Sequence, residues 1–154
     1  KDIIETDTVN YKEISMFIIF PTCNFKCDKE GGMQVCQNSA LALSPNINID
    51  IEHLIHKYLS NPITNAIVCG GLEPFDNWED LYTLITRFRL ITDDDIVIYT
   101  GYNPNEIEEQ INALKHYKNI IVKFGRFIPN QSHHYDKILG VELASPNQYT
   151  ERIS

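Results

Sequence analysis

The sequence lacks three features that would each point to a particular class of protein. It contains no apolar run approaching the roughly 18 residues of a membrane span, and its first residues lack the pattern of a secretory signal. It also has no basic excess, since 13 Lys and Arg stand against 21 Asp and Glu and give a formal net charge of −8. We therefore expect a cytoplasmic protein that binds neither a membrane nor nucleic acid.

Internal repeats, low-complexity segments and linkers are also lacking, so we expect residues 1–154 to form a single domain. Hydrophobic residues make up 43% of the chain, which is ordinary for a globular protein that buries a core. The acidic residues are spread along the chain. Their one short run, DDD at 93–95, predicts a solvated turn.

Two kinds of hydrophobic pattern alternate along the chain. Short apolar runs predict buried strands at 14–20, 65–71, 95–101 and 119–125. Amphipathic segments predict helices at 49–60, 76–91 and 103–116. Asp50 is the expected N-cap of the first helix, and 137–145 is a candidate closing strand. The alternation predicts an α/β fold with a mostly parallel, helix-covered sheet, in a chain too short for a closed eight-stranded barrel.

Three segments follow predicted strands: the loop after 14–20, CGGLEPF after 65–71, and YTGY after 95–101. Parallel strands end at a common edge, where such folds carry their active sites. We therefore expect these segments to meet. The second contains Gly70 and Gly71, which allow a backbone to approach a ligand closely, although ordinary turns use glycine pairs too.

The first segment holds Cys23, Cys27 and Cys36, three of the four cysteines. Its many polar residues disfavour a role in the core, and clustered thiols without a secretion signal more often hold a metal or do redox chemistry than form disulfides. Three thiolates suit a four-iron cluster with one open iron, whereas a structural zinc site would need a fourth ligand, from Cys69 or a histidine. Cys69 lies in the apolar run AIVC and is predicted to be a core side chain.

Taken together, these segments resemble the radical S-adenosylmethionine (SAM) enzymes, which usually show Cys-x3-Cys-x2-Cys and a Gly-Gly-Glu-Pro turn. VIYTGY at 97–102, VKFGRFI at 122–128 and SPNQY at 145–149 resemble the activating enzymes of anaerobic ribonucleotide reductase. The resemblance runs in order over nearly the whole chain. Two departures stand out: an insertion at 28–35 lengthens the last cysteine spacing to eight residues, and Leu72 separates the glycines from the glutamate.

The resemblance implies a partial (βα) barrel of the radical SAM type with helices on its outer face. It implies that Cys23, Cys27 and Cys36 bind three irons of a 4Fe–4S cluster, and that the amino and carboxylate groups of SAM bind the fourth. An electron from the cluster would cleave SAM to methionine and a 5′-deoxyadenosyl radical. No residue is assigned a catalytic role beyond this.

The resemblance also implies a set of SAM-binding residues, which are Val35, Gly70, Gly71, Glu73, Thr100 and Tyr102. The glycine backbone would meet the methionine amino group with the glutamate in support, the valine would pack on adenine, and the threonine and tyrosine would line the pocket. Arg126 is either a surface charge or a contact for a SAM carboxylate.

Three functions are compatible with this pattern. The leading hypothesis is an activase that generates a glycyl radical on the catalytic subunit of anaerobic ribonucleotide reductase, using a one-electron donor such as a flavodoxin. The second is a small radical SAM enzyme that acts on another glycyl-radical enzyme or on a peptide. The third is a zinc- or cluster-binding interaction module without catalysis. The short chain favours the first, because an open partial barrel can admit a loop of a folded partner.

Overall fold

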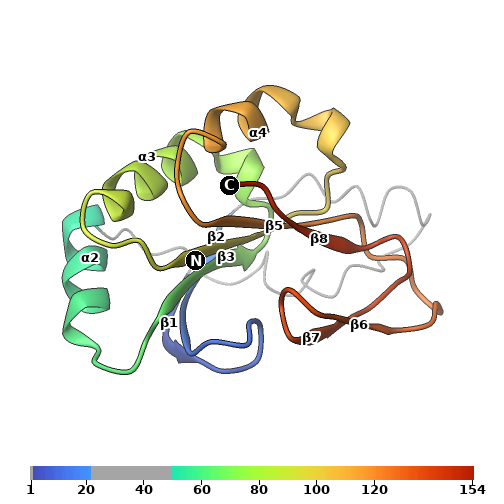
Figure 1. The fold of residues 1–154 in the computed structure, drawn as a ribbon, viewed down its shortest axis with the longest axis horizontal. Helices are drawn as coiled ribbons and strands as arrows, with labels where there is room; N and C mark the ends of the chain where they lie inside the picture. The colour runs from blue at the N-terminus through green and yellow to red at the C-terminus, as the bar shows by residue number, and fades with distance from the viewer. Residues whose placement is uncertain (1, 22–49) are drawn as a thin grey trace.

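The computed structural model describes residues 2–21 and 50–154. Six strands of this part of the chain form one sheet in the order β1-β2-β3-β4-β5-β8 (Figure 1). Their bounds are β1 Asp2–Asp7, β2 Ser15–Phe20, β3 Ala66–Gly71, β4 Asp95–Tyr99, β5 Ile120–Phe124 and β8 Tyr149–Arg152. The four central strands, β2 to β5, run parallel, and the edge strands β1 and β8 pair with them antiparallel.

The four strands predicted from apolar runs are confirmed as β2, β3, β4 and β5. They form continuous apolar runs because both of their faces are covered by other parts of the chain. Among the described residues the sheet is open, with β1 and β8 as its two edges. The partial barrel expected from the resemblance stays a prediction.

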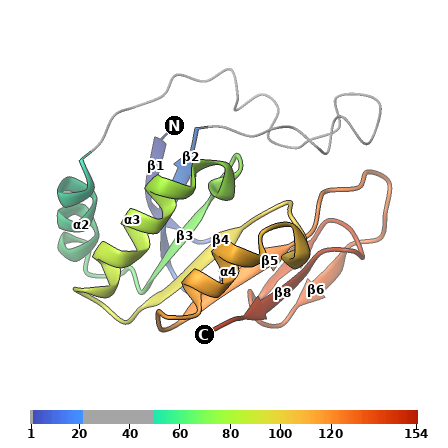
Figure 2. The same ribbon diagram turned by 90° about the horizontal axis from the view of Figure 1, so that it is seen from above.

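The predicted helices are confirmed with small changes at their ends. They are α2 Ile51–Ser60, α3 Trp78–Arg89 and α4 Glu108–Leu114, and all three lie on the same face of the sheet (Figure 2). Short 3₁₀ turns precede the last two, η2 at Pro74–Asn77 and η3 at Pro104–Glu106. Asp50 is the N-cap of α2, where its carboxylate accepts the backbone N–H of Glu52.

The predicted closing strand at 137–145 is wrong. Gly140 has a φ of +74° and the Asp136 carboxylate accepts the N–H groups of Ile138 and Leu139, so the chain turns inside this segment. Only Val141–Leu143 is extended, as β7, and it pairs with β6 (His134–Asp136) in a small second sheet. The edge position beside β5 belongs to β8, and both edge strands escaped sequence prediction.

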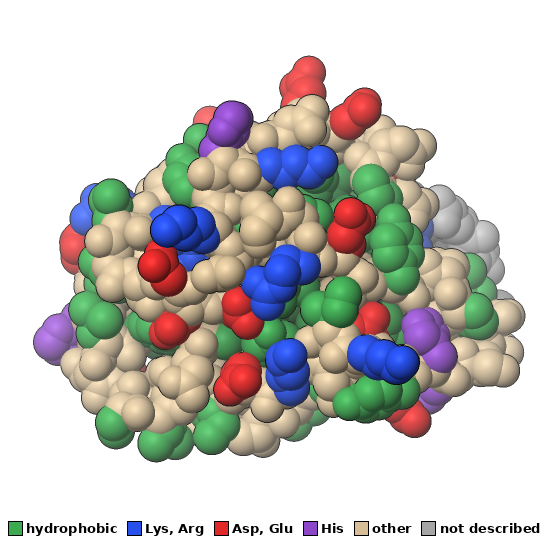
Figure 3. Space-filling view, in the orientation of Figure 1, with side chains coloured by type: hydrophobic (Ala, Val, Ile, Leu, Met, Phe, Trp, Pro, Cys, Tyr) green, Lys and Arg blue, Asp and Glu red, His purple; other side chains and the backbone are tan. Residues whose placement is uncertain are grey.

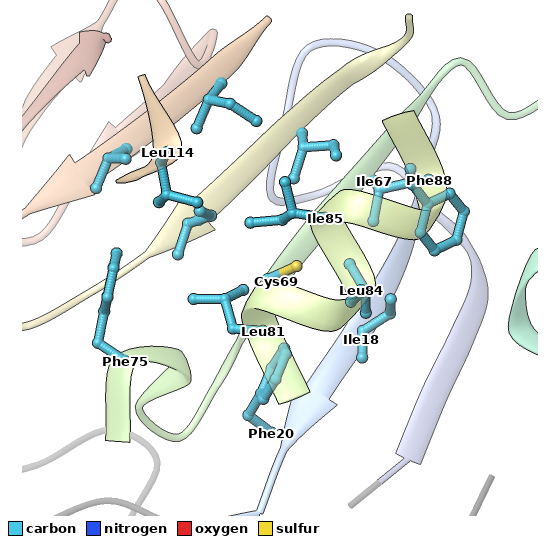
Figure 4. Packing of buried hydrophobic residues seen from close by; sticks show 14 of the residues in the cluster. Ile18, Phe20, Ile67, Cys69, Phe75, Leu81, Leu84, Ile85, Phe88 and Leu114 are labelled. Carbon is cyan, nitrogen blue, oxygen red and sulfur yellow. The ribbon is translucent and has the colours of Figure 1, made fainter. Parts of the chain in front are cut away.

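The two faces of the large sheet carry separate hydrophobic clusters. The helix-covered face buries Ile18, Ile67, Ile98 and Val122 beneath the three helices. Figure 4 shows part of this cluster, with Phe88, Ile85 and Leu81 of α3 directed at the sheet. The opposite face buries Val68, Val97 and Ile121 under Tyr11, Leu139 and Leu143. The segments around β6 and β7 therefore help to cover one face of the sheet, as the three helices cover the other.

The surface of the described part shows no segregation of charge in the view of Figure 3. Acidic and basic side chains are interspersed across that face, and exposed hydrophobic side chains are scattered among them. No helix among residues 2–21 and 50–154 has the length and apolar character needed to cross a membrane.

Candidate iron–sulfur and cofactor site

The candidate site lies at the carboxyl edge of the parallel sheet, where the four central strands end. Phe20 at the end of β2 is in register with Gly71 at the end of β3, and Tyr99 of β4 is in register with Lys123 of β5. The segment that carries the three clustered cysteines follows Phe20 in the chain. The chain therefore leaves β2 beside the glycine turn.

Four of the predicted site residues, Cys23, Cys27, Val35 and Cys36, lie outside the described residues. Within residues 2–21 and 50–154, no group of three or more His, Cys, Asp or Glu side chains is arranged to hold a metal ion. The three loop thiols stay the predicted cluster ligands.

Cys69 is a core residue, as predicted. Its side chain is 0% exposed on the helix-covered face of β3, where Figure 4 shows the sulfur among Leu81, Leu84 and Ile85 of α3. Burial raises the pKa of its thiol to about 12. Because metals bind the thiolate, this cysteine is poorly suited to be a ligand.

The glycine turn at the end of β3 has structural reasons of its own. Gly71 has a φ of +83°, and a Cβ added there would lie 2.5 Å from the Ile19 Cγ2 atom. A Cβ on Gly70 would lie 3.2 Å from the Phe17 ring. Gly71 is thus required by its backbone conformation and by the close approach of β2, whereas a Cβ on Gly70 would only press on the Phe17 ring. Packing against β2 therefore accounts for glycine at this turn without any ligand. The contact of this turn with SAM stays a prediction.

Glu73 is buried directly beyond this turn, with 6% of its surface exposed. One carboxylate oxygen, Oε1, accepts the N–H of Phe75 at 3.1 Å and the hydroxyl of Thr100 at 2.8 Å. The other, Oε2, accepts the N–H of Gly101 at 2.9 Å. The carboxylate therefore connects the end of β3 with the end of β4.

Burial changes the acidity of Glu73. It raises the pKa of the carboxyl group to about 7, and the nearby charge of Asp76 acts in the same direction. The three hydrogen bonds oppose the shift because they favour the charged form. A carboxyl group that titrates near neutral pH in a strand-end position is a feature that functional sites share.

Thr100 and Tyr102 belong to the same network. The Thr100 side chain is buried and its hydroxyl oxygen accepts the N–H of Tyr102 at 3.0 Å, while it donates to Glu73. The Tyr102 hydroxyl donates to Asp76 at 2.6 Å. The structure thus brings Glu73, Thr100 and Tyr102 together beside the glycine turn. Their contact with SAM stays a prediction.

Arg126 follows β5 at the same edge. Its side chain is 12% exposed and forms an ion pair of 2.6 Å with Glu106. The guanidinium also lies 5.8 Å from the centre of the Tyr102 ring, within range of a cation–π contact. Both interpretations of Arg126, as a surface charge and as a contact for a SAM carboxylate, stay predictions.

Comparison with known proteins identifies the family. A family model described as "4Fe-4S single cluster domain" matches residues 12–146, which include the whole cysteine loop. The chain belongs to this iron–sulfur family. No curated protein and no solved structure matches it.

The residues of this iron–sulfur protein fit a single 4Fe–4S cluster. Three cysteines stand close together in the sequence after β2, and three thiolates leave one iron of a four-iron cluster open to a further ligand. The fourth cysteine is held away in the core with a raised thiol pKa.

Sequence reasoning gave no role to two residues of this edge. Lys123 is 6% exposed on β5, where its ammonium donates to the Gly125 carbonyl at 3.0 Å. A single lysine inside the apolar run IIVKF is the signal that could have found it, because a buried lysine needs acceptors.

The second is Gln148, in the turn of SPNQY. Its amide accepts the N–H groups of Ala144 and Ser145 and donates to the Gly125 carbonyl. Asn147 adds a bond of 2.9 Å to the Arg126 carbonyl. The 145–149 turn is thereby attached to the end of β5. Two amide side chains next to each other in a turn are typical of such backbone contacts.

Proposed function

We propose that this iron–sulfur protein is a radical SAM activase, which generates a glycyl radical on the catalytic subunit of anaerobic ribonucleotide reductase. A one-electron donor such as a flavodoxin would reduce the cluster. The observation that carries the proposal is that the described segments of the resemblance, although far apart in the sequence, are bonded to one another at a single edge of the sheet.

The bonds between these segments are specific. Glu73 of the GGLEP turn bonds Thr100 and Gly101 of the VIYTGY segment. The Tyr102 carbonyl accepts the N–H of Gly125, which belongs to VKFGRFI. That segment in turn bonds the SPNQY turn. The motifs therefore form one continuous structure, which is what a shared binding site requires.

In this proposal Cys23, Cys27 and Cys36 hold the cluster, which would supply the electron that cleaves SAM. The backbone at Gly70 and Gly71 would orient the methionine end of SAM. Val35 would pack on the adenine, and Thr100 and Tyr102 would line the pocket. The chain's part is to position SAM and to exclude water from it.

We also propose that the fold is a partial (βα) barrel of the radical SAM type. Its support is the one-sided arrangement of α2, α3 and α4 on a sheet whose four central strands are parallel (Figure 2). A sheet that does not close on itself leaves an edge at which a loop of a folded partner protein could enter.

The cluster ligands can be tested by single replacement of the four cysteines with alanine in anaerobically reconstituted protein. Iron per chain and the visible absorbance should fall to background in the Cys23, Cys27 and Cys36 variants. The Cys69 variant is the matched control, because it removes a thiol of the core, and it should keep its iron. Normal loading without Cys36 and loss of iron without Cys69 would overturn the ligand assignment.

The activity can be tested by mixing the reconstituted protein with its cognate reductase, SAM and an electron donor. We expect the paramagnetic resonance doublet of a glycyl radical on the reductase, and this doublet should collapse when the glycine Cα is deuterated. SAM cleavage with peptide modification but no reductase radical would favour the second hypothesis. If saturating SAM leaves the paramagnetic resonance spectrum of the reduced cluster unchanged, both enzyme hypotheses are ruled out.

A further inference from the structure

The bonds of Glu73 differ from those expected of a ligand-binding carboxylate. A carboxylate has about four acceptor positions, and three of them already hold donors of this chain. The group is 6% exposed, and it also caps the turn η2 through the N–H of Phe75. Its bonds are thus directed at the protein itself.

The neighbouring bonds extend this link across the edge of the sheet. From Glu73 the chain of contacts passes to the Thr100 hydroxyl, then to the N–H of Tyr102, and from the Tyr102 carbonyl to the N–H of Gly125. The ends of β3, β4 and β5 are therefore connected through one buried carboxylate. Residues 100–102 have no regular strand or helix of their own to fix them.

We propose that Glu73 is a positioning residue that holds residues 100–102 against the end of β3. It acts on the SAM site through the place of this turn, and not by binding the amino group of SAM. The effect on SAM rests on the proposed function. The inserted Leu72 is consistent with the assignment, because it is buried and shifts the glutamate one residue further from the glycines than in the usual turn.

The charge of Glu73 offers a direct probe, because its carboxyl group titrates near pH 7. The charged or titratable groups around it in the described part are few. Asp76 lies on its own turn, Tyr102 follows β4, and Arg126 follows β5 and is paired with Glu106. Gly101 lies between Glu73 and Arg126: a Cβ there would be 3.8 Å from Oε2 and 3.5 Å from the arginine Cγ.

The bonds from Glu73 to Phe75, Thr100 and Gly101 are called the clamp from here on. Amide hydrogen exchange of the whole protein, followed by NMR, tests the clamp without any cofactor. In Glu73→Gln, either orientation of the amide sets its NH₂ group against an N–H donor. At least one of the two amides, Gly101 or Phe75, should then exchange about tenfold faster, as expected for a lost bond to a charged group. Glu79→Gln, the same change at an exposed site, should leave both rates unchanged. Unchanged rates in Glu73→Gln would overturn the proposal.

SAM affinity separates positioning from direct binding. If Glu73 positions the turn, Glu73→Gln should weaken SAM binding and also speed exchange of the Gly101 or Phe75 amide. The pH dependence of SAM affinity that the wild type shows near pH 7 should be flattened in this variant. Weaker SAM binding with normal exchange at both the Gly101 and Phe75 amides would make Glu73 a direct ligand and overturn the proposal. If wild-type protein binds no SAM at all, the proposed function fails, and the exchange rates still decide whether the clamp exists.

A measurement on the wild type covers the case in which Glu73→Gln does not fold. The Glu73 carboxyl carbon and the Gly101 amide can be titrated by NMR over pH 5 to 9. The clamp requires that both resonances shift with one midpoint. If the Gly101 amide resonance does not shift as the Glu73 carboxyl group titrates, the two groups are not coupled and the proposal is overturned.

Discussion

Asp94 and Asp95 at the amino edge of the parallel sheet and Glu73 at its carboxyl edge lie in opposite surroundings. At the amino edge, Asp94 and Asp95 stay half-exposed and accept the hydroxyls of Tyr58 and Tyr11, whose side chains are buried. Burial and these bonds raise the pKa of both tyrosines. At the carboxyl edge the carboxylate of Glu73 is itself buried, and its own pKa is raised.

The amino edge is a structural joint. The Arg89 guanidinium donates to the carbonyls of Thr92, Asp94 and Lys118, which ties the end of α3 to the segments before β4 and β5. The expected solvated turn at 93–95 is wrong for Asp95, which is the first residue of β4. The carboxyl edge instead carries a buried carboxyl group whose pKa is raised toward neutrality, and such groups cluster at functional sites. Substitutions at the amino edge should lower only the free energy of unfolding. Substitutions at the carboxyl edge should also alter SAM binding.

The largest expected effect would come from Gly71→Ala, which tests how far the carboxyl edge is itself structural. The φ of +83° disfavours any L side chain by about 1–2 kcal/mol, and a Cβ 2.5 Å from Ile19 adds crowding of a similar size. We expect a loss of about 3 kcal/mol in the free energy of unfolding, measured by urea denaturation.

Gly101→Ala is the matched control for that experiment. Its Cβ would meet its nearest neighbour at 3.5 Å, an ordinary contact, so the change should stay within about 0.5 kcal/mol. Equal losses at the two glycines would mean that the backbone conformation of Gly71 does not decide the cost.

The second effect concerns pH and Glu73. Its folded pKa of about 7 lies above the ordinary value of 4.5, so the folded state binds the proton more tightly than the unfolded state. The contribution of this group is complete below pH 4.5 and is lost as the pH rises to 7. The loss amounts to up to about 3 kcal/mol.

A comparison of variants isolates this contribution. The stability of the wild type minus that of Glu73→Gln should fall between pH 5 and pH 8, because every other titrating group cancels in the difference. The same difference for Glu79→Gln should stay flat. A difference that rises with pH would mean that the hydrogen bonds outweigh burial and that the carboxyl pKa is lowered in the fold.

The pattern of local sequence predicted most of the central fold. Apolar runs bounded by turns located β2 to β5, and helical spacing located the three helices, because both signals arise from neighbours in the chain. The edge strands gave no such signal. β1 and β8 are covered only in part, and their strand form depends on pairing with β2 and β5.

The candidate site was predictable in its location but not in its bonds. Strand order alone places the glycine turn and residues 100–102 at one edge. No local pattern shows that the Glu73 carboxylate reaches across to Thr100, 27 positions away, because that contact depends on the register of β3 with β4. The same holds for Lys123, whose acceptor is set by the turn after β5.

The smallest expected effect is at the amino edge, and it sharpens the contrast between the two edges. Tyr58→Phe removes the hydroxyl that donates to Asp94 but keeps the ring, which packs edge-on against Phe88. Because Asp94 can turn to water, we expect a loss of about 1 kcal/mol in the free energy of unfolding. Tyr135→Phe, at a side chain that is 63% exposed, should change it by less than about 0.5 kcal/mol. Iron per chain and SAM affinity should match the wild type in both variants, and a fall in either for Tyr58→Phe would show that the two edges are coupled.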